Sequence, residues 1–282
     1  MHQTSNSFET EHLVLDAVLM RCWRRSRCLS KRIPGDPHVV SRFECGVIVS
    51  RLVVFSFFRY SVLRVPDAFL RMGFQRFLAD RTMPPGIIRL MGCGGGDGFS
   101  VVPDLHAYCL MRVLADPRDE RRLRQTRFYR SVADASTEQL HFTLTPVSGR
   151  GTWGGESVFD YRGVQQPDRP LVVLTRARVA PTRARAFWRS VPEIRSQLRD
   201  TPGCDYHIGF GEHLLLTLAT FSVWEDLARM QAFAYRTTPH HEAGRASRQE
   251  DWLSESMFVR FAIDRIEGDL ARYPRLAALM ES

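Results

Sequence analysis

The sequence predicts an α+β fold: two ferredoxin-like βαββαβ units that form a dimeric-α+β-barrel-like architecture within one chain of 282 residues. The order strand, helix, strand, strand, helix, strand can be read twice along the chain. Local matches link the copies, AFLRM with AFWRS and LHAYCLMRVLAD with LLTLATFSVWED. One unit makes a four-stranded sheet with both helices on one face. Its other face is apolar and needs a partner, which the second copy can supply.

The first unit is expected over residues 51–146. VIVSRLVVFSFF is a β-branched and aromatic run, typical of a strand, and PDAFLRMGFQRFLAD has an approximately helical spacing of apolar residues. Two short strands follow around the glycine-rich turn GCGGGDG. Pro117 then opens a polar helix, because proline suits the first helical turn. EQLHFTLTPV alternates apolar residues and closes the unit as a strand.

The second unit is expected over residues 171–265, after a Gly- and Pro-rich connector at 147–170 with a small hairpin around Trp153. Its strands are LVVLTRARV, CDYHIGFGE, LLLTLATFSVW and ESMFVRFAID, with a Gly-Phe-Gly turn between the middle two. Its helices are RARAFWRSVPEIRSQL and EDLARMQAFAYR. Residues 1–50 are predicted to be a disordered or non-native extension, and 266–282 a C-terminal tail that can be helical. The space between sheet and helices is expected to form an apolar pocket.

Composition limits the partners. The net charge of +8 comes almost wholly from arginine, since Lys31 is the only lysine. We expect a solvated basic surface and no nucleic acid, while peripheral contact with an anionic membrane remains open. No apolar run reaches the roughly 18 residues of a spanning helix. The six cysteines show no CxxC spacing, so neither a zinc site nor a disulfide framework is indicated. A cytoplasmic location, with or without peripheral attachment to the inner or photosynthetic membrane, fits best.

Several catalytic motifs are absent. The stretch GCGGGDG lacks G-x-G-x-x-G and is not followed by Gly-Lys-Ser/Thr, so it is expected to be a tight turn rather than a nucleotide site. Neither G-x-S-x-G nor H-E-x-x-H occurs. His240 and His241 are adjacent, so their side chains point in different directions around a helix and cannot chelate one ion together.

The stretch TFSVWEDLARMQAFAYRTTPHHEAGR carries the remaining candidates. Glu225 and Asp226 favour a helix N-terminus, and Pro239 restarts the helix before the two histidines. A histidine there could cap the helix, act as an acid or base, or bind iron through a neutral ring nitrogen. The matching helix of the first copy, RRLRQTRFYRSVADAS, has no histidine. Any such site is therefore expected once per chain.

Residues 52–265 resemble the spheroidene monooxygenase family of carotenoid biosynthesis. The resemblance rests on SFFRY and MGFQRF in the first half, and on LVVLTRARV, FWRSVP, GFGEHLLLTLATFSVWEDLARMQAFAYRTTPHH and WLSESMFVRF in the second. It implies conversion of acyclic carotenoids such as spheroidene to a 2-oxo product by two oxygenations, with electrons from reduced ferredoxin. It also implies a haem. A wider similarity to antibiotic-biosynthesis monooxygenases and haem-degrading proteins implies His240 as the axial ligand, with His241 as the alternative.

An inert C–H bond needs an oxidant that side chains cannot make, so a cofactor is expected to supply it. A long polyene needs an aromatic-lined channel, for which the candidates are Phe187, Trp188, Phe221, Trp224, Phe233 and Tyr235, unless they are core residues. Arg176 and Arg236 are candidates to pair with haem propionates, because the arginine fork suits carboxylates.

Two other functions remain open on the same fold. One is a cofactor-independent monooxygenase in which a histidine acts as base toward a substrate that itself activates oxygen. The other is a non-catalytic haem or lipid carrier.

Overall fold

The structure, a computed structural model, describes residues 52–66, 70, 83–95, 100, 102–213, 216–236 and 252–281. All of them belong to one compact unit. The expected extension at 1–50 and most of the helix expected at 66–80 lie outside the described residues.

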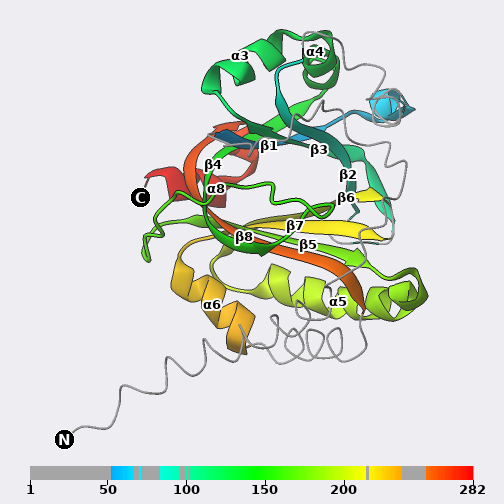
Figure 1. Ribbon diagram of the computed structural model, residues 1–282, viewed down its shortest axis with the longest axis vertical. Helices are drawn as coiled ribbons and strands as arrows, with labels where there is room; N and C mark the ends of the chain where they lie inside the picture. The colour runs from blue at the N-terminus through cyan, green and yellow to red at the C-terminus, as the bar shows by residue number, and fades with distance from the viewer. Residues whose placement is uncertain are drawn as a thin grey trace, which may run out of the picture. The chain divides into compact units, whose positions relative to one another are not determined.

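The first half forms a sheet in the order β4-β1-β3-β2, with helices on its outer face (Figure 1). Asp116 caps the first helix by accepting a hydrogen bond from the backbone N–H of Arg118 at 2.7 Å, and Pro117 occupies the first turn. The elements are β1 (Leu52–Arg59), η1 (Val62–Arg64), β2 (Gly86–Gly94), β3 (Pro103–Leu114), α3 (Pro117–Gln125), α4 (Arg127–Ala133) and β4 (Glu138–Gly151).

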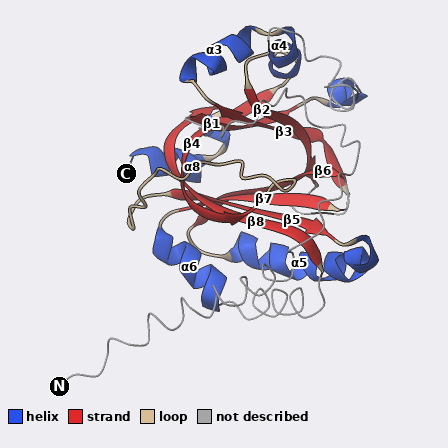
Figure 2. Ribbon diagram, in the orientation of Figure 1, coloured by secondary structure: helices blue, strands red, loops and turns tan. Residues whose placement is uncertain are grey.

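The second half repeats this plan in the order β8-β5-β7-β6, with its helices again on the outer face (Figure 2). The elements are β5 (Leu171–Val179), η2 (Pro181–Arg183), α5 (Ala184–Asp200), β6 (Cys204–His213), β7 (Thr217–Trp224), α6 (Leu227–Arg236) and β8 (Leu253–Gly268). β8 continues to Gly268, three residues into the stretch expected to be the C-terminal tail, and after it come η3 (Leu270–Arg272) and α8 (Pro274–Glu281).

The two sheets close into one barrel through two seams, β2 with β6 and β4 with β8. Each seam joins the same strand of the two copies, as a two-fold axis between identical units would. Equivalent glycines end the seam strands. Gly151 ends β4 with φ +86°, and Gly268 ends β8 with φ +120°. A Cβ at Gly151 would collide with the backbone oxygen of Ser256, and a Cβ at Gly268 with that of Gln139. The predicted duplicated barrel is therefore confirmed.

Aromatic and aliphatic side chains fill the barrel interior. Phe55, Phe57, Phe142 and Phe221 meet with ring centroids 4.9–6.0 Å apart. The segment after β4 adds Trp153, Val158 and Phe159 to this core, and the segment after β8 adds Leu276. In each copy, the segment after the last strand thus contributes side chains to the barrel core.

Two local expectations were wrong. The Gly-Phe-Gly stretch is not a turn: Gly209 pairs with Thr220 and Gly211 with Leu218 inside the β6–β7 ladder, and the chain reverses later. The polar helix after Pro117 is not continuous, because Thr126 leaves the helical conformation and caps a second helix through its Oγ1, which accepts from the N–H of Tyr129 at 3.1 Å.

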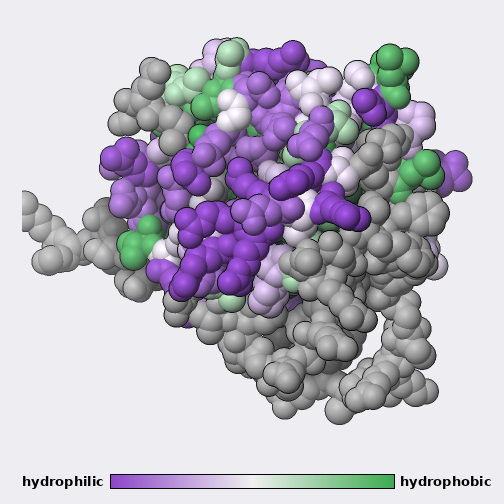
Figure 3. All heavy atoms as spheres, turned by 90° about the horizontal axis from the view of Figure 1, so that it is seen from above, coloured by the Kyte–Doolittle hydropathy of each residue, from purple (hydrophilic) through white to green (hydrophobic). Residues whose placement is uncertain are grey.

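The surface seen from above is largely hydrophilic (Figure 3). It includes the arginine-rich outer side of α3, where Arg118, Arg121 and Arg122 are exposed. Within the described part of the chain, no helix is long and apolar enough to cross a membrane.

Candidate functional site

The two copies can be compared residue by residue through their strand registers. Ser56 faces Leu110 and His141 across β1, and Thr175 faces Thr220 and Phe258 across β5. Leu52 pairs with Leu114 as Leu171 pairs with Trp224, and a helix begins three residues after each of these strand ends. The equivalent positions follow: Ser56 and Thr175, Arg112 and Ser222, Glu120 and Met230, Leu123 and Phe233, His141 and Phe258.

In the first half, a buried ion pair lies beside an apolar cluster in the layer between sheet and helices, which we call the first layer. Arg112 is fully buried, and its Nε and Nη2 donate to the two carboxylate oxygens of Glu120 at 2.9 and 3.0 Å. Its Nη1 donates to Ser56 Oγ at 3.0 Å, and that oxygen lies 2.6 Å from His141 Nδ1. Burial opposes ionisation of Glu120, but Arg112 and Arg124 outweigh it and hold its pKa below the ordinary value.

His141 is kept neutral in this layer. Burial, together with the charges of Arg112 and Arg124, lowers its pKa from 6.5 to about 4. Glu120 and Asp269 act in the opposite direction and are outweighed. Among the described residues, Glu120, Arg112, Ser56 and His141 thus form one continuous polar network in the first layer.

In the second half, the corresponding space, which we call the second layer, is apolar. Met230 and Phe258 replace the glutamate and histidine of the first layer, and Trp224 and Phe233 meet there with centroids 5.3 Å apart. The indole N–H of Trp224 donates to Ser222 Oγ at 2.9 Å, so the ring's polar atom is satisfied. Burial raises the pKa of the Cys204 thiol to about 12, so this side chain is an apolar wall rather than a thiolate.

The predicted haem ligands follow α6 in the sequence. His240 and His241 lie outside the described residues. Tyr235 and Arg236 end α6, the helix that carries Met230 and Phe233, but the structure describes only their backbone. Their roles stay predictions.

The predicted channel residues do not share one space. Trp224 and Phe233 belong to the second layer, whereas Phe221 is buried on the opposite face of β7, inside the barrel. Phe187 and Trp188 are half-buried on α5 and contact each other edge to face at 5.7 Å. Strand alternation therefore separates Phe221 from the other aromatic candidates.

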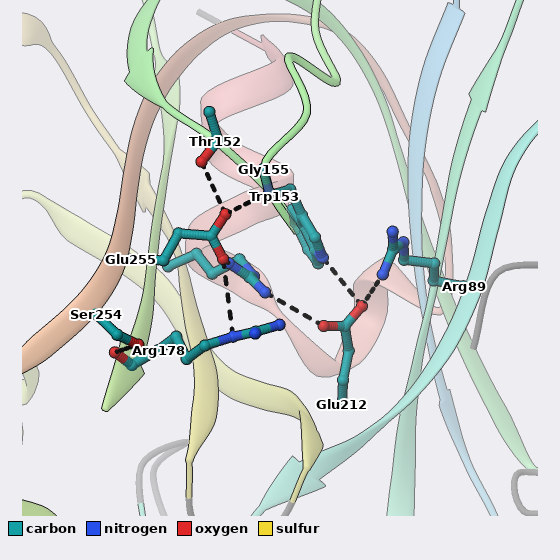
Figure 4. A network of polar contacts seen from close by, with 9 residues as sticks. Arg89, Thr152, Trp153, Gly155, Arg178, Glu212, Ser254 and Glu255 are labelled. Atoms are coloured by element: carbon teal, nitrogen blue, oxygen red, sulfur yellow. Dashed lines mark hydrogen bonds and ion pairs between the residues drawn. The ribbon is translucent and has the colours of Figure 1, made fainter. Parts of the chain in front are cut away.

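Arg176 forms ion pairs with two carboxylates inside the barrel, those of Glu212 and Glu255. Figure 4 shows these two glutamates on either side of the network. Arg176 is 1% exposed, and its Nη1 and Nη2 donate to Glu255 Oε2 at 2.7 Å and Glu212 Oε2 at 3.4 Å. Its guanidinium also stacks on Trp153, 4.8 Å from the ring centroid. Because its charge is already balanced there, the geometry gives Arg176 a structural role, and its pairing with a propionate stays a prediction.

The same network fixes the start of the segment after β4, which carries Trp153 into the core. Glu212 accepts from Arg89 and from the indole N–H of Trp153 at 2.9 Å, and Glu255 accepts from Thr152 Oγ1 at 2.7 Å and the N–H of Gly155 at 2.8 Å. Burial opposes ionisation of both glutamates, but the neighbouring arginines and hydrogen bonds hold each pKa below its ordinary value.

Sequence reasoning missed these charged residues, although a signal existed. In a strand, alternate residues share a face. Arg89, Arg176, Glu212 and Glu255 each continue the apolar alternation of their own strand, in step with Met91, Leu174, Phe210 and Met257. Two arginines and two glutamates on inward-facing positions indicate that these side chains form ion pairs with one another.

A small cavity of about 140 Å³ lies at another site on the barrel wall, among the ends of β1, β4 and β6. Phe57 and Tyr206 line its apolar side, and Asp104 and Glu138 its polar side. Glu138 accepts hydrogen bonds from Tyr273 Oη and from Arg272 Nη1, the latter at 2.8 Å. This cavity is far smaller than a carotenoid.

No group of three or more His, Cys, Asp or Glu side chains that could hold a metal ion occurs among the described residues. A haem needs only one protein ligand, which the prediction places at His240.

Comparison with known proteins identifies close relatives. The chain is 36% identical over 197 residues to the spheroidene monooxygenase of Rhodobacter capsulatus, covering 68% of this chain and 82% of that protein. It is 34% identical over 203 residues to that of Rubrivivax gelatinosus, covering 70% and 77%. Against the enzyme of Cereibacter sphaeroides it is 32% identical over 177 residues and spans 55% of that protein. No family model matches the sequence.

Among solved structures, the aldoxime dehydratase OxdRE in complex with butyraldoxime superimposes with a TM-score of 0.53. The superposition covers 90% of this chain and 93% of that one at 13% sequence identity. At that identity the likeness concerns the fold alone.

Proposed function

Because the chain belongs to the spheroidene monooxygenase family and is a monooxygenase, we propose that it converts the acyclic carotenoid spheroidene into its 2-oxo product, spheroidenone. Two successive oxygenations at one carbon account for this product. Each takes one O2, two electrons and two protons, places one oxygen atom on the carbon as a hydroxyl group and releases the other as water. Loss of water from the resulting geminal diol leaves the ketone. Reduced ferredoxin supplies the electrons.

One observation supports the proposal: at the positions where the first layer has a buried ion pair, the second layer has none. In the first layer, Arg112 and Glu120 form a buried ion pair. At the equivalent positions of the second layer stand Ser222 and Met230, and the walls there are sulfur, aromatic and aliphatic groups. Such walls suit a flat apolar macrocycle and a polyene, since hydrophobic and aromatic side chains dominate the binding sites of large apolar ligands. The difference supports the second layer as the proposed site.

The proposed cofactor is haem, held by His240 or, alternatively, His241. The side chains of the second layer fit such an apolar group, because Trp224, Met230 and Phe233 present no unpaired polar atom to it. When bound, haem supplies the activation of oxygen that side chains cannot. The protein's own part is to exclude water with this apolar layer and to orient the substrate. Arg236, next to the ligand segment, is proposed to pair with a propionate.

The sharpest test is production of the chain in a host that accumulates spheroidene, with mass analysis of the pigments. We expect the mass gain of a carbonyl at C2. His240→Ala should abolish it and also remove the Soret band of protein reconstituted with haem, while His241→Ala should retain both. The reverse result would move the ligand to His241.

A control separates loss of the ligand from loss of the fold. Ser222→Arg with Met230→Glu transfers the ion pair of the first layer into the second layer and should remove both the haem band and the product, with an unchanged circular dichroism spectrum. Ser222→Ala should retain both. Turnover without iron would support the cofactor-independent mechanism. A haem band without any change in pigment would support a carrier.

A further inference from the structure

Exposed apolar side chains gather at one end of the first half. Seven large apolar side chains are exposed among the residues that the structure describes, and four of the seven belong to two short segments. Val62 is 74% and Leu63 91% exposed on η1, while Val102 is 69% and Leu105 41% exposed around the start of β3. Single exposed apolar residues are ordinary, but a group of them marks an interaction surface.

The pairing of β1 with β3 brings the two segments together. Beyond the end of the ladder, the N–H of Tyr60 donates to the carbonyl oxygen of His106 at 2.8 Å. Arg59 and Asp104 join the same strand ends by an ion pair of 2.9 Å. The residues before His106 therefore run beside the chain that enters η1, and in Figure 1 the light blue segment that carries η1 lies at the outer margin of the first half. We call this group the apolar tip: Val62, Leu63, Val102 and Leu105.

The fold does not require apolar residues at this turn. η2 occupies the place of η1 in the second copy, and there Pro181 and Thr182 stand where η1 has Val62 and Leu63. No residue of η1 is buried, so these two side chains contribute little to the core. A partner outside the chain therefore explains their apolar character better than internal packing does.

We propose that the apolar tip inserts into the headgroup region of an anionic lipid bilayer and holds the protein on the membrane surface. Arg64 is exposed next to Leu63 on η1. It can lay its aliphatic stem along the inserted side chains and keep its guanidinium at the lipid phosphates. The net charge of +8 attracts the chain toward such a surface. This attachment does not depend on the proposed activity.

The composition of the apolar tip favours a lipid over a protein partner. Protein interfaces are enriched in aromatic residues and methionine, and leucine and valine are under-represented among the residues that dominate their affinity. The apolar tip consists of leucine and valine alone. A second copy of this chain is disfavoured as the partner, because two molecules that each carry a net charge of +8 repel each other. An anionic bilayer offers an apolar interior together with the opposite charge.

The test measures binding of the full chain to vesicles of phosphatidylcholine and phosphatidylserine by co-sedimentation. Leu63→Asp places a charge at the most exposed position of the apolar tip and should lower the vesicle partition coefficient about tenfold or more. Thr182→Asp makes the same change of charge at the equivalent position of the second half. Val164→Asp replaces an apolar side chain that is 80% exposed outside the apolar tip. Both control variants should bind the vesicles nearly as well as the wild type.

A tryptophan reports insertion directly. Leu63→Trp should bind at least as tightly as the wild type, and brominated lipid chains should quench its added fluorescence. The added fluorescence of Thr182→Trp should not be quenched. Because both positions are exposed, the circular dichroism spectrum should stay unchanged in each variant.

Three outcomes would overturn the proposal: no vesicle binding by the wild type, equal losses in Leu63→Asp and Val164→Asp, or unquenched fluorescence of Leu63→Trp on bound vesicles. Sedimentation velocity provides the competing outcome. If Leu63→Asp converts a dimer into a monomer while vesicle binding is unchanged, the apolar tip is an interface between two copies of the chain.

Discussion

At the scale of single residues, Arg176 shows how a hydrophobic barrel accommodates charge. Moving an ion from water into a protein interior costs several kcal/mol, and that cost is offset only when partners surround it. Arg176 has two carboxylates and an indole ring as neighbours, and each carboxylate has further donors. The residues are therefore stable only as a group.

Arg176→Met should lower the free energy of unfolding by about 3–5 kcal/mol, because Glu212 and Glu255 would lose their shared partner inside the barrel. Denaturant unfolding measures this. Arg178→Met is the matched control: its side chain is 41% exposed and lies 3.8 Å from Glu255, so the loss should be under about 1 kcal/mol. Similar values for the two variants would contradict a buried network.

The partners of Arg176 could not be predicted from the sequence alone. Alternation within β5 places Arg176 on the inner face, but Glu212 and Glu255 lie 36 and 79 residues further along the chain. The sheet of the second half brings them together, because β8 lies directly beside β5 and β6 lies two strands away on the other side. For that reason the sequence suggested an external carboxylate as partner and missed the internal ones.

At the scale of elements, the first layer joins β1, β3, β4 and α3 through one polar chain from Glu120 to His141. His141 is buried as a neutral ring, and its pKa of about 4 lies below the ordinary value of 6.5. Since the unfolded chain binds the proton more readily, acid favours unfolding. The stabilisation is complete above pH 6.5 and is lost as the pH falls from 6.5 toward 4.

We expect the free energy of unfolding to fall by about 3 kcal/mol over this window on account of His141 alone. Urea unfolding between pH 7 and pH 4 measures the slope. His141→Gln, which cannot take up the proton, should give a slope shallower by up to one proton. Identical slopes for wild type and variant would show that His141 is not the titrating group.

Secondary structure was predictable where one pattern dominated. The β-branched and aromatic runs of β1, β5 and β7 specify strands without reference to the rest of the molecule. The Gly-Phe-Gly stretch failed because glycine indicates a turn locally, whereas Gly209 and Gly211 are held extended by pairing with β7. The prediction of one continuous helix through Thr126 failed for a similar reason. A threonine can lie inside a helix, or its hydroxyl can cap a new one, as it does here.

At the scale of the whole molecule, each half depends on the other to cover its inner face. Val259 and Phe261 of the second half lie fully buried against residues of the first. Each seam pairs equivalent strands, so a second copy of the second half could replace the first half by forming β6–β6 and β8–β8 seams.

A chain of residues 165–282 should therefore form a dimer rather than a folded monomer, as measured by sedimentation equilibrium. Met257→Asp places a charge on the inner face, where Met257 is 2% exposed, and should abolish the dimer. A monomeric, folded wild-type fragment would contradict this account of barrel closure.

The sequence predicted the duplication and placed the candidate ligands in the second half, because the matching helix of the first half has no histidine. It did not predict the ion pair of the first layer. That Arg112 and Glu120 meet depends on the packing of α3 against β3, which only the three-dimensional structure provides.

The covalent link between the halves has a genetic consequence. In a barrel built from two identical chains, every substitution appears twice, so a mutation that fills one layer fills both. Here a codon changes one layer only, and Glu120 and Met230 can coexist at equivalent places. One gene therefore encodes two halves that can diverge, each free to accumulate changes that the other could not tolerate.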